Sequence, residues 1–107
     1  MPFEIVLAPH AIEGLKALRA DIQSSVRDAI ELHLRHEPTK PSKSRIKRLR
    51  GIDRPQYRLR VNEIRVFYDV TETAVEVLAI IPKEQADAWL AEEASPASPG
   101  GPGKGQG

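Results

Sequence analysis

The chain lacks several features that would each point to a definite class of protein. It has no cysteine, which excludes disulfides, thiolate metal sites, iron–sulfur clusters and cysteine nucleophiles. No run approaches the roughly 20 apolar residues of a membrane-spanning helix, and the N-terminus has no basic region followed by an apolar one. We therefore expect a cytoplasmic protein that is stabilised by apolar burial and has no contact with a membrane.

Glycine is also sparse where it would matter for nucleotide binding. Between Gly14 and the C-terminal segment the only glycine is Gly51, so the glycine-rich loops that bind nucleoside triphosphates and dinucleotides are absent. His33 and His36 are three residues apart, but no third ligand follows at a matching spacing. The sequence therefore predicts neither a metal nor a small-molecule cofactor.

The charge, by contrast, is abundant and unevenly distributed. The 107 residues carry a net charge of only +1. The segment 40–65 contains ten basic and two acidic residues, a net charge of +8, so the remainder of the chain carries −7. Such segregation produces a local positive field whatever the total charge is. We therefore look for the functional site in this segment.

The hydrophobic spacing predicts an α+β domain over residues 1–93. A period of two indicates strands at 1–7, 57–61, 64–69 and 75–81, and helical spacing indicates helices at 9–18, 22–34 and 83–93. The second helix must end by Glu37, because Pro38 and Pro41 follow. The predicted order β-α-α-β-β-β-α implies a small, mostly antiparallel sheet with the N-terminal helical hairpin packed on one face.

The last fourteen residues, 94–107, form a segment of different composition. They include five glycines and three prolines and no large apolar side chain. Such a segment gains too little from burial to offset the entropy cost of ordering. We predict a disordered tail that follows the folded domain.

The strand 57–61 presents basic side chains at alternate positions. Arg58 and Arg60 project to one face about 6.5 to 7 Å apart, and Arg65 enters the neighbouring strand after a tight turn. If Leu59 faces the helices, the three guanidinium groups share the open face, where their planar donors match phosphate oxygens. The alternative is a solvated face with ordinary surface charge.

The aromatic residues of the same region divide between the two faces. By parity Tyr57 and Tyr68 point into the core, which leaves Phe67 as the stacking surface for a base. In the final helix, Trp89 is expected to anchor the helix to the core rather than to stack on a base.

Four short motifs extend the pattern: Lys47-Arg48-Leu49-Arg50-Gly51, Tyr57-Arg58-Leu59-Arg60-Val61, Ile64-Arg65-Val66-Phe67-Tyr68-Asp69-Val70 and Val75-Glu76-Val77-Leu78-Ala79-Ile80. Together they resemble the RelE/ParE superfamily of toxins from bacterial type II toxin-antitoxin modules. The helical hairpin and the element order agree, so the resemblance covers about residues 3 to 90.

The resemblance implies a RelE-like fold and one of two activities. RelE-type members are metal-independent, ribosome-dependent endoribonucleases that cut messenger RNA, and ParE-type members act against DNA gyrase. For the first, favoured activity, it implies a catalytic set and an RNA-docking set, with a cognate antitoxin, the ribosome and messenger RNA as partners. The catalytic set is Arg58, Arg60, Arg65 and Lys83, and the RNA-docking set is Lys43, Arg45, Lys47, Arg48 and Arg50.

The C-terminal motif departs from that of many active members. They carry a His-Arg or Lys-Arg pair after the last strand and a tyrosine shortly beyond. This chain has Lys83 and Glu84 at the corresponding place, and no tyrosine follows them. Arginine is too basic to act as a general base, so Lys83 and Glu63 are the candidates for proton transfer. The alternatives are a ParE-like gyrase inhibitor, a catalytically degenerate RNA-binding homologue, or a small RNA-binding module without toxic activity.

Overall fold

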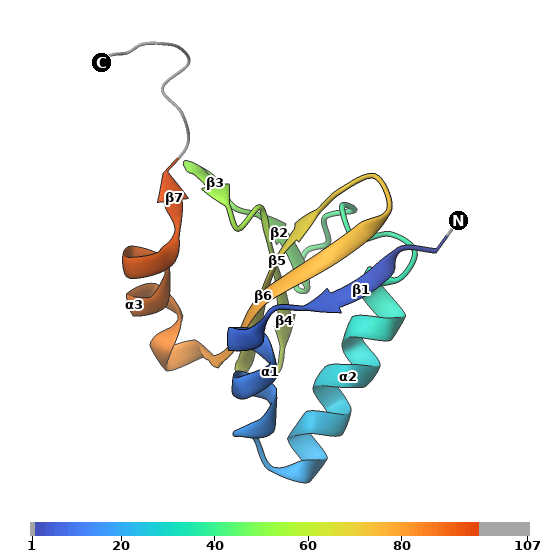
Figure 1. Ribbon diagram of the computed structural model, residues 1–107, viewed down its shortest axis with the longest axis vertical. Coiled ribbons are helices and arrows are strands. Elements are labelled where there is room, and N and C mark those ends of the chain that lie inside the picture. Colours follow the sequence, from blue (N-terminus) through green and yellow to red (C-terminus); the bar gives the residue numbers. More distant parts are fainter. Residues whose placement is uncertain (1, 97–107) are drawn as a thin grey trace, which may run out of the picture.

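A computed structural model of the chain describes residues 2–96 (Figure 1). A first strand leads into a helical hairpin, a run of strands follows, and a third helix and a short strand close the described part. In chain order the elements are β1 (Glu4–Leu7), α1 (Pro9–Lys16), α2 (Ala20–Leu34), β2 (Ile46–Arg48), β3 (Ile52–Arg54), β4 (Tyr57–Val61), β5 (Ile64–Val70), β6 (Ala74–Pro82), α3 (Lys83–Glu93) and β7 (Ser95–Pro96). Within this part of the chain, none of the helices has the length and apolar character needed to cross a membrane.

The main sheet has five strands in the order β1-β6-β5-β4-β2. Strand β1 runs parallel to β6, and the other neighbours are antiparallel. The turn between β4 and β5 places Asn62 at a positive φ of 52°, a conformation that asparagine tolerates better than most residues. The second sheet consists of β3 and β7 alone. The α+β class predicted from the sequence is thus confirmed.

The helical hairpin covers one face of the sheet and forms the main core. Val26, Ile30 and Leu34 of α2 recur at helical spacing and pack against Leu59 and Val66 of the sheet. On the same side, the Tyr68 hydroxyl donates a hydrogen bond of 2.7 Å to the Pro38 carbonyl, which fixes the loop after α2. Burial of these alternate positions in β4 and β5 dictates that the residues between them face the other side.

Helix α1 lies unusually close to β6. A Cβ atom built on Gly14 would lie 2.1 Å from the Ile80 carbonyl oxygen, a separation that no side chain can occupy. Only glycine fits at this contact, because the two backbones approach without a side chain between them. Gly14 therefore sets the spacing between the first helix and the sheet.

The opposite face of the sheet is only partly open. Helix α3 packs across it through a second, smaller cluster of apolar side chains, in which the Phe67 and Trp89 rings stack with centroids 5.1 Å apart. The expectation that this whole face is free was therefore wrong. The arginine-bearing part of it lies beside α3 rather than on an empty sheet.

Three short strands were not predicted. Strand β2 consists of the buried Ile46 followed by two exposed basic residues, which is too short a pattern to show a period of two. Ser95 and Pro96 belong to the segment expected to be a tail, yet they pair with β3 through the backbone. The rest of that expected tail, 97–107, lies outside the described residues.

Candidate functional site

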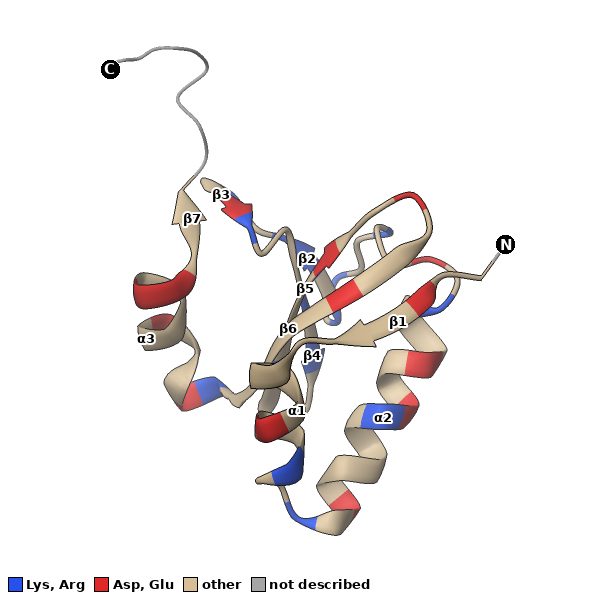
Figure 2. Cartoon of the chain, viewed as in Figure 1, with Lys and Arg blue, Asp and Glu red and all other residues tan. Residues whose placement is uncertain are grey.

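The register of the sheet brings the basic strand residues onto one face. Across β2 and β4, Lys47 is the direct partner of Arg58, and across β4 and β5, Arg60 is the direct partner of Arg65. Figure 2 shows the basic positions on β2 and β4 and the acidic positions along α3. The shared face predicted for Arg58, Arg60 and Arg65 is therefore present in the structure.

A groove of about 520 Å³ lies between this face and α3. Four cationic side chains from four different elements line it: Lys47, Arg58, Arg65 and Lys83. Leu49, Phe67 and Leu90 supply an apolar part of the wall, and Glu84 and Asp87 of α3 line it as well. The groove thus combines a cluster of positive charge with an apolar surface.

Arg58 carries a buried donor without a partner in the described part of the chain. Its Nε is the one buried side-chain nitrogen or oxygen within residues 2–96 that has no hydrogen-bond partner. Burial lowers the pKa of its guanidinium, and the neighbouring charges of Arg65 and Arg60 lower it further. An anion in the groove would supply the missing acceptor and relieve the repulsion among the three arginines.

Arg65 is held in place by the turn that precedes it. Its Nη1 donates to the carbonyl oxygens of Asn62 at 2.8 Å and of Ile64 at 3.1 Å. These bonds use one nitrogen of the guanidinium and leave the others available to a ligand. The β4–β5 turn therefore orients the arginine that the sequence analysis placed at the phosphate.

The two candidates for proton transfer are bonded to each other. Lys83 Nζ lies 2.9 Å from Glu63 Oε1, and the Lys83 backbone N–H donates to the Glu63 carbonyl at 2.8 Å. The hydrogen bond and the charge of Lys83 lower the pKa of the Glu63 carboxyl. Glu63 is therefore ionised at neutral pH, where it can accept a proton but has none to donate.

The remaining predicted basic residues do not share the groove. Lys43 and Arg50 lie in exposed loop positions. Arg48 points to the other side of its strand, where it lies 5.3 Å from the centre of the Tyr57 ring and donates to the Gln56 carbonyl. Arg45 lines a separate pocket at the end of α2. Among the residues expected to dock RNA, only Lys47 lines the groove.

Phe67 does not serve as the exposed stacking surface that the sequence suggested. Its side chain is only 1% exposed, because Trp89 of α3 stacks on it with an interplanar angle of 19°. The alternation rule placed Phe67 on the correct face but could not show that a helix covers it. The role expected for Trp89, anchoring the last helix, agrees with this contact.

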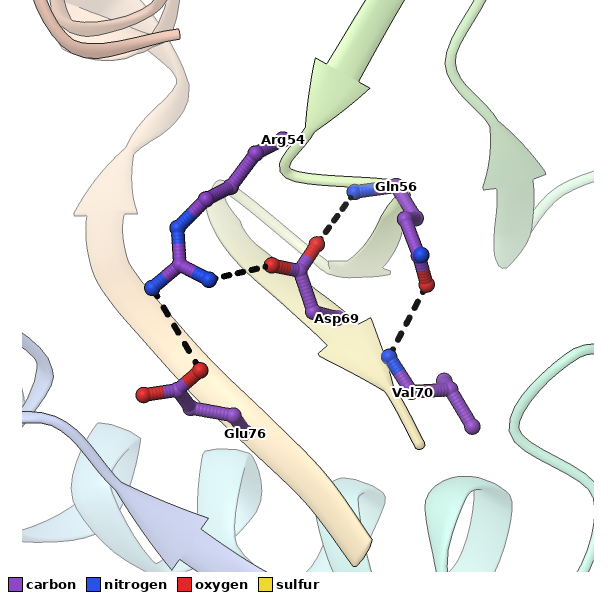
Figure 3. Close-up of polar contacts among 5 residues, drawn as sticks. All are labelled: Arg54, Gln56, Asp69, Val70 and Glu76. Atoms are coloured by element: carbon purple, nitrogen blue, oxygen red, sulfur yellow. Dashed lines mark hydrogen bonds and ion pairs between the residues drawn. The ribbon is translucent and has the colours of Figure 1, made fainter. Parts of the chain in front are cut away.

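Sequence reasoning missed a polar network on the same face, beyond the arginine cluster (Figure 3). Asp69, only 8% exposed, accepts hydrogen bonds of 3.0 Å from Arg54 Nη1 and 2.8 Å from the Gln56 backbone N–H. Arg54 also reaches Glu76 at 3.4 Å, and the Gln56 amide oxygen accepts from the Val70 N–H at 2.9 Å. Burial raises the pKa of Asp69, against the opposing effects of these donors.

The network ties the β3–β4 connection to the ends of β5 and β6. Arg54 is the last residue of β3 and Gln56 lies in the connection to β4, whereas Asp69 and Glu76 are direct cross-strand partners. Arg54 is thereby paired with acids, unlike Arg58 and Arg65. The signal in the sequence was the pair of acidic residues opposite each other in the predicted hairpin, which an isolated count of basic residues does not register.

The family of the chain follows from its match to a known sequence family. A family model described as ParE toxin of type II toxin-antitoxin system, parDE, matches residues 5–87, which include the helical hairpin and the strands β2, β4, β5 and β6. The chain belongs to this family, within the RelE/ParE superfamily, and is a toxin of a type II toxin-antitoxin module. A comparison with curated proteins gave no match.

Solved structures of related toxins share the fold. The archaeal RelE-RelB complex from Pyrococcus horikoshii matches with 21% identity and a TM-score of 0.64, covering 78% of this chain and 97% of that chain. The RelB-RelE complex from Methanococcus jannaschii matches with 18% identity and a TM-score of 0.62, covering 78% of this chain and 96% of that chain. The RelBE2 complex from Mycobacterium tuberculosis matches with 22% identity and a TM-score of 0.57, covering 77% of this chain and 99% of that chain.

Proposed function

We propose that this toxin holds RNA in the groove beside α3 and cleaves messenger RNA on the ribosome, in the cytoplasm. The main support for this proposal is Arg58 Nε, which is buried and has no hydrogen-bond partner within residues 2–96. Three further cationic side chains line the same groove. An unpaired buried donor is costly, and a phosphate oxygen supplies the acceptor it lacks. The fold shared with RelE toxins supports the same function.

The chemistry needs little beyond charge and orientation. The 2′-hydroxyl of the substrate attacks the adjacent phosphorus, the bond to the 5′-oxygen breaks, and a proton reaches that leaving oxygen. Arg58 and Arg65 stabilise the negative charge that develops on the phosphate. Arg60, two residues after Arg58 on β4 and paired with Arg65 on β5, adds to the positive field. Lys83 donates a proton to the leaving 5′-oxygen, and Glu63, ionised beside Lys83, accepts the proton that the attacking 2′-hydroxyl loses.

The other predicted basic residues act in docking. In this proposal they contact phosphates of ribosomal RNA from the loops and the edge strand on which they lie: Lys43, Arg45, Lys47, Arg48 and Arg50. Binding of this kind weakens with salt, because each phosphate contact releases condensed counterions. Removing one contact with single-stranded RNA reduces the slope of log affinity against log salt by about 0.7.

The test is a cleavage assay with purified ribosomes and a defined message. Arg58→Gln and Arg65→Gln should each abolish cleavage while the far-ultraviolet circular dichroism stays unchanged. Arg27→Gln removes an exposed charge from α2, away from the groove, and should cleave as the unchanged toxin does. Intact message at toxin concentrations that stop translation or growth would contradict the proposal.

Inhibition of DNA gyrase is the second candidate, and one observation favours it. The family model that matches residues 5–87 is that of the ParE toxin. A supercoiling assay separates the two functions, because a gyrase inhibitor blocks supercoiling and leaves messages intact. A catalytically degenerate homologue would bind RNA through the same groove without either effect.

We also propose a cognate antitoxin as the protein partner. The structural neighbours are toxin-antitoxin complexes with RelB proteins. An acidic or amphipathic segment laid along the groove would neutralise Arg58 and Arg65 and cover the apolar wall at Leu90. Co-expression with the protein encoded next to the toxin should give a complex and restore growth. Growth arrest that persists beside a soluble neighbour product would contradict this pairing.

A further inference from the structure

A second basic pocket lies away from the groove, where α2 ends and the chain turns back toward the sheet. Its volume is about 190 Å³, and its walls come from the last turn of α2, the following loop and the start of β2. The charged and titratable side chains that line it are His33, His36, Glu37, Lys40 and Arg45. No part of the proposed cleavage chemistry uses this pocket.

The positive charge in this pocket is poorly compensated. Lys40 Nζ lies 3.9 Å from the Glu37 carboxylate, a long and exposed ion pair. Within residues 2–96, the Arg45 guanidinium has neither a hydrogen bond nor an ion pair, and the two imidazoles accept and donate none. One acidic group thus faces two permanent cations and two imidazoles, which become cations when they are protonated.

The backbone around Arg45 is nevertheless well ordered by hydrogen bonds. The Ser42 Oγ accepts 3.0 Å bonds from the N–H groups of Arg45 and Ile46, and the Arg45 carbonyl accepts from the Arg60 N–H at 2.8 Å. These bonds fix the direction in which Arg45 leaves the sheet edge. The free hydroxyl proton of Ser42 is also available to a ligand, because Oγ only accepts in the bonds described.

We propose that this pocket is a phosphate-binding site, in which Arg45 and Lys40 provide permanent charge and the imidazoles of His33 and His36 provide further hydrogen-bond donors. Phosphate fits the donor set, since guanidinium, ammonium, imidazolium and hydroxyl groups all donate to oxygen, and the single carboxylate that lines the pocket, Glu37, is already paired with Lys40. The ligand is either a free phosphate group or a backbone phosphate of a nucleic acid. The inference is independent of whether the groove cleaves RNA.

The imidazole of His33 makes this binding sensitive to pH. Its burial, and then the nearby charge of Arg45, lower the pKa of His33. A bound anion would offset the field of Arg45 and raise that pKa, so binding takes up a proton. The affinity should therefore increase as the pH falls, by about tenfold for each unit by which the His33 pKa rises on binding.

The test follows the His33 and His36 imidazole resonances of the full chain by NMR while sulfate is added. Sulfate serves as the probe because its own charge is constant between pH 5.5 and 8. We expect saturable shifts of both resonances, with at least about tenfold tighter binding at pH 5.5 than at pH 8. The absence of saturable shifts, or equal affinity at the two pH values, would overturn the proposal.

Matched variants locate the binding. Arg45→Gln should abolish the saturable shifts, and His36→Gln should weaken the sulfate affinity and leave the His33 resonance responsive. Arg27→Gln removes one positive charge from the exposed side of α2 and should bind sulfate as the unchanged chain does. Sulfate shifts that persist in Arg45→Gln would reject the site, and circular dichroism of each variant confirms that it has folded.

A second arm of the experiment identifies the source of the phosphate. A short oligoribonucleotide with hydroxyl groups at both ends offers backbone phosphates only. If it shifts the same two imidazole resonances, the pocket accepts a nucleic-acid backbone, which would extend the contact surface around the edge strand β2. If sulfate and inorganic phosphate act and the oligonucleotide does not, the site takes a free phosphate.

Discussion

Arg60 and Arg65 are direct cross-strand partners on β4 and β5. Side chains at such positions start about 5 Å apart at Cβ, so two guanidinium groups there repel each other. Arg65 is bonded to the turn carbonyls, whereas Arg60 is exposed and makes no side-chain hydrogen bond within residues 2–96. A charge arrangement that costs stability in the free protein points to a counter-charge supplied from outside.

Replacing Arg60 should therefore stabilise the free protein. Arg60→Gln removes the like-charge pair, and we expect the free energy of unfolding in urea to rise by about 0.2 to 1 kcal/mol. The gain should shrink at high salt, because salt screens exposed charges. The same experiment with Arg27→Gln should show no comparable gain. A loss of stability in Arg60→Gln would mean that the repulsion is already relieved within the chain.

Gly14 should tolerate no side chain. In an exposed helix, replacing glycine with alanine normally stabilises by about 1 kcal/mol. Here the added Cβ would meet the Ile80 carbonyl oxygen at 2.1 Å, so α1 must move away from β6. We expect Gly14→Ala to lower the free energy of unfolding by about 1 to 3 kcal/mol. Glu13→Ala, at the neighbouring exposed position, is the control, and equal stability of both variants would refute the close approach.

Trp89 should hold α3 against the sheet. Trp89→Ala removes the ring that stacks on Phe67, and we expect a loss of about 2 kcal/mol, less than for a fully buried tryptophan. The loss should be local, with faster amide exchange in α3 than in β5 and β6. Trp89→Phe keeps an aromatic ring at this position and should restore most of the protection. Unchanged exchange in α3 would show that other contacts hold the helix.

The ion pair between Lys83 and Glu63 should be detectable as a lowered pKa of the Glu63 carboxyl when the protein is titrated with acid. Because Lys83 lowers the pKa of Glu63 below its ordinary value of 4.5, this carboxylate contributes stability above that pH. The contribution is lost as the pH falls through the lowered pKa of the folded state. In Lys83→Gln the Glu63 pKa should return toward 4.5, measured by NMR of the carboxyl carbon. An unchanged pKa would show that the pair does not form in solution.

Much of the fold could be predicted because apolar residues repeat with a clear period. Val26, Ile30 and Leu34 mark one face of α2, and Leu59, Val61 and Val66 mark the core face of the sheet. The same alternation predicted that Arg58, Arg60 and Arg65 share the other face. A two-residue period determines the face of every residue in a strand once one of them is known.

Contacts between segments that are distant in the chain could not be predicted from the periodicity of apolar residues. Phe67 was assigned to the correct face, but no local pattern reveals that Trp89 covers it. Likewise, the pairing of Ser95 with Arg54 depends on backbone groups, which carry no residue-specific signal. The separation of Arg45 and Arg48 from the groove follows from the path of β2, a strand too short to predict. Where elements meet depends on tertiary packing rather than on local periodicity.

The parallel pairing of β1 with β6 has a consequence for how the toxin is made. Glu4 pairs with Ala74, so the first strand has no neighbour in the sheet until the strand near the end of the domain has been synthesised. A growing chain that stops before residue 74 lacks both the partner of β1 and one neighbour of β5. Prematurely terminated products therefore lack β6 and cannot form the complete five-stranded sheet. The complete sheet thus forms only after nearly the whole domain has been synthesised.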